Sequence, residues 1–237
     1  MKYAEILELV QEKKPHLQQL HQKGLNKFTI PGYSKGSIRT CEAQILYSII
    51  QDRGYSRILD IGTGPGFSAV YFAKALQSNN IMGHVDTIDI SAPPLETFKL
   101  FGVDDIVNIH TGDSADIVPT LGLYDLILID SSHTYEQTLK EYNTCIERLN
   151  PGGCMVFHDV FPVPVNYPDK GPRGVLEDIV EKTYPVTYFT EEMFDLFSYQ
   201  DDLLEIKRMK EKWEIHNYSY RDRSANPKEA MALMSKS

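Results

Sequence analysis

The feature that most constrains the fold of this chain is an alternation of short apolar segments with helical patterns. The apolar segments are rich in β-branched and aliphatic residues and are bounded by turn residues, as β-strands are. They are RILDI (57–61), HVDTIDI (84–90), IVNIHTG (106–112), LILID (126–130), CMVFHDV (154–160), PVTYF (185–189) and MFDLFSYQ (193–200). Helical patterns at about 68–76, 95–101, 135–149 and 175–182 separate these segments. We therefore predict an α/β fold with a doubly wound, mostly parallel, seven-stranded Rossmann-like sheet that carries helices on both faces.

Two helical segments precede the first predicted strand. The first is residues 3–22, and the second begins after Thr40, which we predict as its N-cap. The inner face of the second helix is Ile45, Leu46, Ile49 and Ile50. We divide the chain into an N-terminal helical segment (1–40), a ligand-binding domain (41–200) and a C-terminal helical extension (201–237).

The longest irregular connection is the proline-rich segment FPVPVNYPDKGP at 161–172. Long connections in compact domains are often lids or binding loops. The alternative is a surface loop without a function, and the sequence leaves both interpretations open.

Composition and charge exclude several classes of protein. The formal net charge of −9 argues against a nucleic-acid backbone as substrate, because phosphate binding relies on clustered Lys and Arg. No apolar run approaches the roughly 18 residues of a membrane span, and the N-terminus is too charged for a signal peptide. The three cysteines are too scattered for a disulfide framework. We therefore expect a cytoplasmic protein that binds neither nucleic acid nor membrane.

Glycine and acidic residues follow the predicted strands at their carboxyl ends, where such sheets bind ligands. The first strand leads into DIGTGPG (60–66), whose glycines permit a tight turn and close approach of a ligand to the backbone. The spacing of Gly62, Gly64 and Gly66 differs from the G-x-G-x-x-G of dinucleotide-binding proteins. Asp89 ends the second strand, where it is placed to accept hydrogen bonds from a ribose diol. The later strands end in Gly112, Asp113 and Ser114, in Asp130, and in His158 and Asp159.

Over roughly residues 38–200 the chain resembles the class I S-adenosylmethionine-dependent methyltransferases. The motifs LDIGTGPG, DTIDI, TGDS, LILIDSSH and LNPGGCMVFHD carry this resemblance. It implies that the domain at 41–200 binds S-adenosylmethionine, with the methionine part in the glycine loop and the ribose hydroxyls at Asp89. The implied cofactor-binding residues are Asp60 at the amino end, Gly62, Thr63, Gly64, Gly66, Asp89, Asp113 and Ser114 at the adenine, and Glu42.

Within this superfamily, IDSSHTYEQTLKEY and LNPGGCMVFHDV are similar to the metal-dependent small-molecule O-methyltransferases. The closer likeness is to the macrocin and cephalosporin-tailoring branch, and the more distant one is to catechol O-methyltransferases. The likeness implies a divalent cation, Mg²⁺, held by Asp130 and Asp159. The chain departs from both branches at His158, which as a third ligand would also admit Mn²⁺, Fe²⁺ or Zn²⁺ and otherwise is a core histidine.

The stretch LILIDSSHTY (126–135) places a histidine at the mouth of the predicted site. Thr134 begins a capping-box pattern, so a helix is predicted to start at Tyr135. His133 therefore precedes a helix N-terminus, whose partial positive charge favours a neutral imidazole that can accept a proton. We predict that Asp130 and His133 are catalytic, with His133 as the general base. The alternative is that both are ordinary turn residues.

The predicted function is transfer of a methyl group from S-adenosylmethionine to a hydroxyl of a small polar molecule, such as a sugar or a natural-product intermediate. Two other classes stay open: a metal-independent methyltransferase acting on nitrogen or a macromolecule, and a non-methylating nucleotide-binding protein. Segment 1–40 and the aromatic segment WEIHNYSYRDRS (213–224) lie outside the core pattern. We expect a homo-oligomer in which segment 1–40 helps to cover the acceptor pocket.

Overall fold

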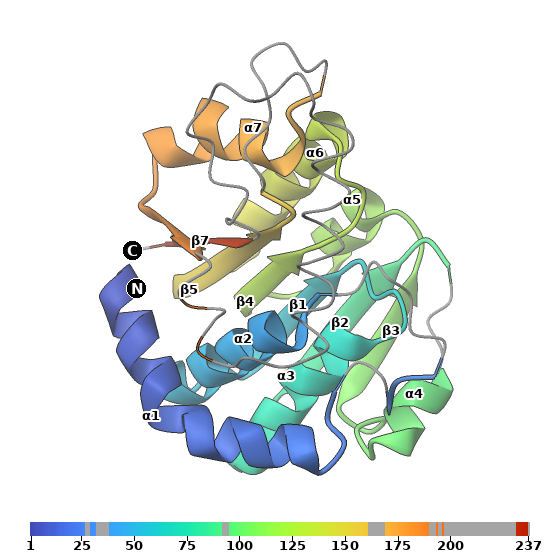
Figure 1. The fold of residues 1–237 in the computed structure, drawn as a ribbon. Helices are drawn as coiled ribbons and strands as arrows, with labels where there is room; N and C mark the ends of the chain where they lie inside the picture. The colour runs from blue at the N-terminus through green and yellow to red at the C-terminus, as the bar shows by residue number, and fades with distance from the viewer. Residues whose placement is uncertain are drawn as a thin grey trace, which may run out of the picture.

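A single mixed sheet organises the chain (Figure 1). The computed structural model describes residues 1–26, 29–31, 38–91, 95–160, 169–189, 193, 196 and 231–236. The strand order is β3-β2-β1-β4-β5-β7-β6, and only β7 runs antiparallel to its neighbours within this described sheet. The strands are β1 (Arg57–Ile61), β2 (His84–Asp89), β3 (Val107–Thr111), β4 (Tyr124–Ile129), β5 (Leu149–His158), β6 (Val186–Phe189) and β7 (Met231–Ser235). The predicted doubly wound, mostly parallel seven-stranded sheet is confirmed.

The seventh strand comes from a different segment than the sequence predicted. The prediction placed it at MFDLFSYQ (193–200), of which only Met193 and Leu196 are described, and neither lies in the sheet. The strand is instead Met231–Ser235, inside the segment predicted as a helical extension. MALM lacks β-branched residues, so its strand signal is weak. Burial decides its structure, because alternate residues of β7 enter the core on both faces of the sheet.

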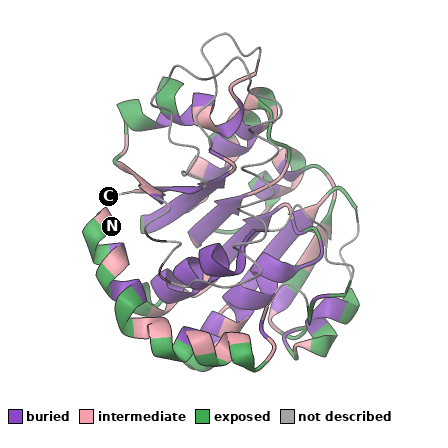
Figure 2. Ribbon diagram, in the orientation of Figure 1, coloured by how far each residue is buried: buried purple, intermediate pink, exposed green. Residues whose placement is uncertain are grey.

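Helices cover both faces of the sheet. One face carries α1 (Tyr3–Gln22), α2 (Thr40–Arg53), α3 (Phe67–Ser78) and α4 (Leu95–Leu100). The other face carries α5 (Ser114–Ile117), α6 (Tyr135–Ile146) and α7 (Gly171–Asp178). Short 3₁₀ turns follow α5 at Val118–Thr120 and α7 at Val180–Lys182. Because both faces are covered, the central strands are buried along nearly their whole length (Figure 2).

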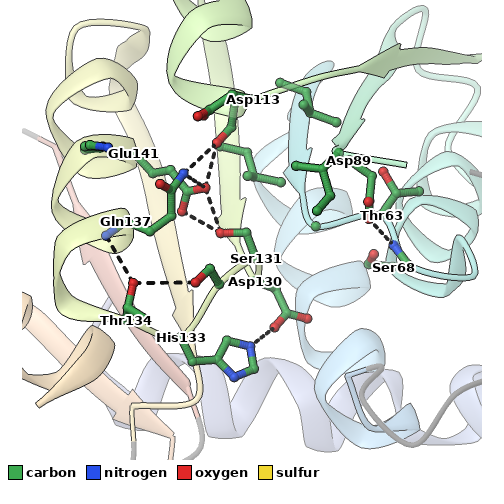
Figure 3. A pocket seen from close by; sticks show the side chains of 18 of the residues that line it. Thr63, Ser68, Asp89, Asp113, Asp130, Ser131, His133, Thr134, Gln137 and Glu141 are labelled. Carbon is green, nitrogen blue, oxygen red and sulfur yellow. Dashed lines mark hydrogen bonds and ion pairs between the residues drawn. The ribbon is translucent and has the colours of Figure 1, made fainter. Parts of the chain in front are cut away.

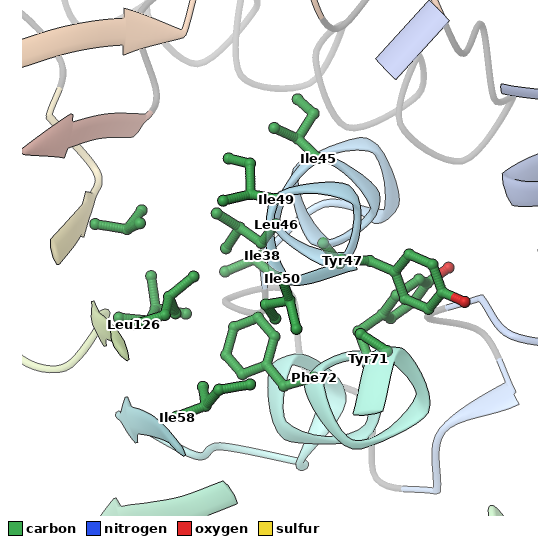
Figure 4. Packing of buried hydrophobic residues seen from close by; sticks show 14 of the residues in the cluster. Ile38, Ile45, Leu46, Tyr47, Ile49, Ile50, Ile58, Tyr71, Phe72 and Leu126 are labelled. Atoms are coloured by element: carbon green, nitrogen blue, oxygen red, sulfur yellow. The ribbon is translucent and has the colours of Figure 1, made fainter. Parts of the chain in front are cut away.

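Side chains along each central strand alternate between the two halves of the core. On β4, Leu126 and Leu128 pack toward α2 and α3, whereas Ile127 and Ile129 pack toward α6. Figure 4 shows the first half, in which Leu126 and Ile58 face the aliphatic and aromatic side chains of α2 and α3. This two-residue period also decides which polar side chains at the strand ends can meet. Residues of β5 that share a face with Val156, His158 among them, point toward α2.

Three predicted helix boundaries need correction. Arg39, not Thr40, is the N-cap of α2, and its backbone N–H donates to the Glu42 carboxylate at 2.6 Å. The helix α6 starts at Tyr135 as predicted but ends at Ile146 rather than at 149, because Leu149 already pairs with β4. The helix α7 begins at Gly171, earlier than the predicted 175.

The N-terminal helix α1 is joined to the end of the sheet. The Met1 ammonium group donates to Ser235 Oγ at 2.9 Å, and Thr187 Oγ1 donates to the Met1 carbonyl at 2.9 Å. Ile6 and Val10 of α1 are fully buried in the core. None of the described helices is long and apolar enough to cross a membrane. Oligomeric state and cytoplasmic location stay predictions, and segment 213–224 lies outside the described residues.

Candidate functional site

A cavity of about 680 Å³ opens at the carboxyl ends of β1, β2, β3 and β4. This is the point where the strand order reverses, since the chain runs from β1 outward to β3 and then returns to β4. The predicted site residues that line the cavity are Gly62, Thr63, Gly64, Asp89, Asp113, Ser114, Asp130 and His133. The predicted site residues outside this lining are Asp60, Gly66, Glu42, His158 and Asp159.

The glycine loop after β1 adopts a backbone that requires glycine. Gly62 has φ of +95°, and a Cβ on it would lie 1.9 Å from the carbonyl oxygen of Asp130. Gly66 has φ of +89° and is the N-cap of α3, packed against the Phe98 ring. The loop therefore lies directly against the end of β4, and its peptide groups line the cavity.

Asp89 is held in place by hydrogen bonds at both carboxylate oxygens. The Gly64 N–H donates to Oδ2 at 2.9 Å, and the N–H and hydroxyl of Ser91 donate to Oδ1, each at 3.0 Å. Each oxygen of a carboxylate has about two acceptor sites, so one site on Oδ2 remains for a hydroxyl of a ligand. The predicted role of Asp89 at the ribose hydroxyls stays a prediction.

Asp60 is fully buried behind the loop and does not line the cavity. Its Oδ2 accepts hydrogen bonds from Ser68 Oγ at 2.9 Å and Thr87 Oγ1 at 3.0 Å. Its Oδ1 has no hydrogen-bond partner among the described residues. Burial raises the pKa of Asp60 to about 7. Direct contact of Asp60 with the amino end of the cofactor therefore stays a prediction.

The far wall of the cavity includes Ser131, Gln137 and Glu141, three residues that the sequence prediction missed. Ser114 Oγ donates to Glu141 Oε1 at 2.6 Å, and Ser131 Oγ lies 2.7 Å from each oxygen of the same carboxylate. Gln137 Nε2 donates to Glu141 Oε1 at 3.1 Å (Figure 3). The available signal was the four-residue spacing of Gln137 and Glu141, which places both on one side of α6. Asp113 instead caps α5, accepting from the Ala115 N–H at 2.9 Å.

Two carboxylates and a histidine meet at the edge of the cavity. His133 Nδ1 lies 2.8 Å from Asp159 Oδ2, and His133 Nε2 lies 3.6 Å from Asp130 Oδ1. Asp159 follows β5 with φ of +52°, a left-handed conformation that is costly for a residue other than glycine. Such local strain is often found at functional sites. The structure thus brings Asp130, His133 and Asp159 together as predicted, although Asp159 does not line the cavity itself.

A buried ion-pair chain lies behind these carboxylates. His158 Nδ1 lies 3.1 Å from Asp130 Oδ1, and His158 Nε2 lies 3.1 Å from Glu42 Oε2. Glu42 is fully buried and accepts a hydrogen bond from Arg39 Nε at 2.9 Å. Glu42 therefore holds His158 rather than lining the cavity as a cofactor contact. The contacts of His158 make it an internal partner of Asp130, which disfavours the predicted role as a metal ligand.

The electrostatics of this cluster oppose the prediction of a neutral His133. The helix N-terminus favours the neutral imidazole, but the carboxylates of Asp130 and Asp159 raise the pKa of His133 to about 10. Burial alone would lower the pKa of His158, but Asp130, Glu42 and Asp159 raise it well above its usual range. The two carboxylates therefore favour the imidazolium form of His133 at neutral pH.

The residues of this cluster fit a divalent cation. One ligand atom from each of Asp130, His133 and Asp159 lies within 4.8 Å of the others. Asp130 Oδ1 is buried and has no partner with hydrogen-bond geometry among the described residues, so a lone pair is available. Carboxylate oxygens are the ligands that Mg²⁺ prefers in proteins. The donor set that the structure groups thus includes His133 where the sequence predicted His158.

Sequence comparisons agree with this architecture. A family model described as Methyltransferase domain matches residues 59–160. The catechol O-methyltransferase domain-containing protein 1 of Mus musculus is 26% identical over 144 residues, covering 56% of this chain and 53% of the relative. The chain thus spans about half the length of the curated relative that it matches. Residues 59–160 thus match a methyltransferase domain inside the region that the sequence analysis found to resemble the class I S-adenosylmethionine-dependent methyltransferases.

Solved structures share the fold. The O-methyltransferase from Bacillus cereus, in complex with SAH, has a TM-score of 0.63 at 15% identity, covering 93% of this chain and 90% of that chain. The O-methyltransferase TomG from Streptomyces achromogenes, described as involved in tomaymycin synthesis and solved with SAM, has a TM-score of 0.58 at 18% identity. That match covers 94% of this chain and 89% of TomG. At these identities the likeness establishes the Rossmann-like methyltransferase fold.

The close approach of the glycine loop to β4 predicts different effects for one substitution at two positions. Gly62→Ala should lower the free energy of unfolding by about 3 kcal/mol or more, because the methyl group collides with the Asp130 carbonyl. Gly64→Ala is the matched control, since it has φ of +50° but no atom within 4 Å of a Cβ. It should cost only about 1 kcal/mol. Urea denaturation measures both, and equal losses would contradict the prediction.

Proposed function

We propose that this chain, whose residues 59–160 match a methyltransferase domain, transfers the methyl group of S-adenosylmethionine to a hydroxyl of a small polar molecule with the help of a divalent cation. The observation that carries the proposal is one cavity that joins the glycine loop and Asp89 to Asp130 and His133. A cofactor and an acceptor can therefore meet there. Such proximity is the main requirement of a reaction between two bound molecules.

The glycine loop, the start of α3 and Asp89 would hold the cofactor. Peptide groups of Gly62 and Gly64 approach the cavity without side chains in the way, and the N-terminus of the 12-residue helix α3 favours a carboxylate. Ser68, which bonds the buried Asp60, also lines the cavity. The diol of the ribose would bond Asp89. Asp130 and His133 line the same cavity, so a methyl acceptor held by them would meet the bound cofactor there.

Asp130 and Asp159 would hold the cation, and His133 would accept the proton of the acceptor. Methyl transfer from a sulfonium to a hydroxyl is an in-line displacement, in which the hydroxyl loses its proton as the C–O bond forms. A bound divalent cation lowers the pKa of such a hydroxyl and orients it. His133 can take the proton only when the charge of its two carboxylate neighbours is balanced by another cation.

The charges of the cluster support a link between cation binding and the proton on His133. Arg39, His133 and His158 are paired with Glu42, Asp130 and Asp159, three cationic with three acidic side chains. A divalent cation would raise the net charge of this cluster from zero to about +2, and loss of the proton from His133 would reduce it to about +1. Metal binding to protonated ligands generally releases protons. The alternative is that His133 is itself the third ligand of the cation rather than the base. The grouping of its ring with both carboxylates favours this alternative.

Binding experiments separate the proposed function from the other classes. S-adenosylhomocysteine should bind to the chain in calorimetry, and NAD should not, because the glycine spacing differs from that of dinucleotide sites. With a hydroxylated acceptor, a chelator should abolish methyl transfer and Mg²⁺ should restore it. Binding of NAD without S-adenosylhomocysteine would identify a different nucleotide-binding protein. Full activity in the presence of the chelator would reject the metal-assisted mechanism.

Removal of the His133 ring should affect turnover rather than cofactor binding. His133→Ala should lower kcat by about 10²-fold or more, because a positioned base contributes roughly that factor. Its affinity for S-adenosylhomocysteine should stay close to that of the wild type. The matched control is His16→Ala, at an exposed histidine of α1 outside the cavity. Loss of cofactor affinity would make His133 structural, and loss of Mg²⁺ affinity would make it a ligand.

The titration of His133 tests the fit of the cation without any turnover. In the protein freed of divalent ions, its ring should stay protonated at pH 8 and titrate near pH 10, since Asp130 and Asp159 stabilise the charged form. Saturating Mg²⁺ should lower this pKa, because the cation neutralises the same carboxylates. Proton and carbon NMR of the ring reports both values, with Asp159→Asn as control. A titration unchanged by Mg²⁺ would exclude binding at these carboxylates.

A further inference from the structure

The end of the proline-rich segment at 161–172 lies beside the turn that carries His133. Residues 169–172 belong to the part of this segment that the structure describes, and α7 begins there. Asp169 Oδ1 accepts two hydrogen bonds, from the Tyr135 N–H at 2.8 Å and from the Gly171 N–H at 2.7 Å. One carboxylate oxygen therefore joins the first residue of α6 to the first residue of α7.

Gly171 brings α7 into contact with the backbone of His133. Its φ of +54° is left-handed, and a Cβ on it would lie 2.8 Å from the His133 carbonyl oxygen. Real Cβ atoms essentially never come so close to another atom, so a side chain would fit only if the His133 peptide moved. The close approach to His133 and the backbone conformation thus both require glycine at this position.

The turn that carries His133 is also held by α6. Ser131 Oγ is bonded to the carboxylate of a buried glutamate of α6, and the Thr134 hydroxyl caps the same helix. The ring of Tyr135, the first residue of α6, lies against Gly174 of α7. Contacts with α6 thus lie on both sides of His133 in the chain, whereas α7 contacts the peptide of His133 itself.

The position of the His133 ring decides whether it can serve the reaction. Its Nδ1 lies 2.8 Å from Asp159 Oδ2, and its Nε2 lies 3.6 Å from Asp130 Oδ1. His133 lines the cavity, whereas Asp169 and Gly171 are outside its lining. A reacting group that is displaced by about 1 Å can lose a factor of about 10² in rate. Residues that fix the His133 peptide can therefore affect the reaction without touching a ligand.

We infer that Asp169 and Gly171 are positioning residues, which fix the peptide of His133 and thereby hold its ring at the cavity beside Asp159. This inference rests on the proposed function, in which His133 serves the transfer as the base or as a ligand of the cation. Because both residues act through His133, they affect turnover rather than cofactor binding. The described end of the proline-rich segment thus has a role that the sequence left open.

The main test compares one substitution at two glycines. Gly171→Ala should lower kcat for methyl transfer by about tenfold or more, because the new methyl group displaces the His133 peptide. Its affinity for S-adenosylhomocysteine, measured by calorimetry, should stay that of the wild type. The matched control is Gly54→Ala at the C-cap of α2, where φ is +62° and no atom lies within 4 Å of a Cβ. It carries the same backbone strain and should leave kcat unchanged.

A double-mutant cycle separates positioning from a general loss of stability. In a chain that carries His133→Ala, Gly171→Ala should cause little further loss of kcat, because the ring that it displaces is absent. Asp169→Ala should lower kcat in the wild-type background only. Asp169→Asn keeps an oxygen that can accept both hydrogen bonds, so it should restore most of the rate. The two Asp169 variants test the inference even where Gly171→Ala fails to fold.

NMR of the His133 ring in the ligand-free protein adds a measurement without turnover. Its proton and carbon resonances should shift in Gly171→Ala and stay in place in Gly54→Ala. Unshifted resonances, equal rates in the two glycine variants, or a loss that is the same with and without the His133 ring overturns the inference while the proposed function stands. A wild-type chain that transfers no methyl group overturns the proposed function, and the NMR comparison then decides the inference alone.

Discussion

The structure depends on the close contact between the loop after β1 and the end of β4. A Cβ added to Gly62 would lie only 1.9 Å from the carbonyl oxygen of Asp130. The Asp130 N–H donates to the Ile61 carbonyl at 2.8 Å. Adjacent parallel strands impose this proximity, and glycine alone satisfies it. The contact places the cofactor loop and the acidic cluster in one cavity. Any ligand that binds the loop is therefore brought beside Asp130.

The second determinant is the alternation of side chains along β5. His158 shares a face with Val156, so it points toward α2 and meets the buried Glu42. Asp159 follows in a left-handed conformation, which turns its carboxylate toward His133. The end of β5 thus supplies the buried His158 on the side of α2 and the partly exposed Asp159 on the side of His133. The ion pairs compensate for the burial of charge, which would otherwise be costly.

Most strands and helices could be predicted from the sequence, but one strand and several helix boundaries could not. The first five strands and α6 have strong local signals: aliphatic runs for the strands and a capping box at Thr134, whose hydroxyl accepts from the Gln137 N–H. The strand Met231–Ser235 has a weak local signal and is held by antiparallel pairing with β5 on one side and β6 on the other. The end of α6 moved for a similar reason, since Leu149 pairs with β4. Pairing between distant segments outweighs propensity in both cases.

For the site, the sequence by itself determined which chemical groups stand at the strand ends. Glycines, Asp89, Asp130, His133 and Asp159 each follow a strand, and parallel strands bring such residues to one edge. The tertiary structure alone decided their partners and charge states. Glu42 from α2, itself paired with Arg39, holds His158, Glu141 from α6 accepts from two serines, and paired carboxylates raise the pKa of His133. The reason is physical: strand and helix patterns are local, whereas burial, pairing and pKa depend on contacts between residues far apart in the chain.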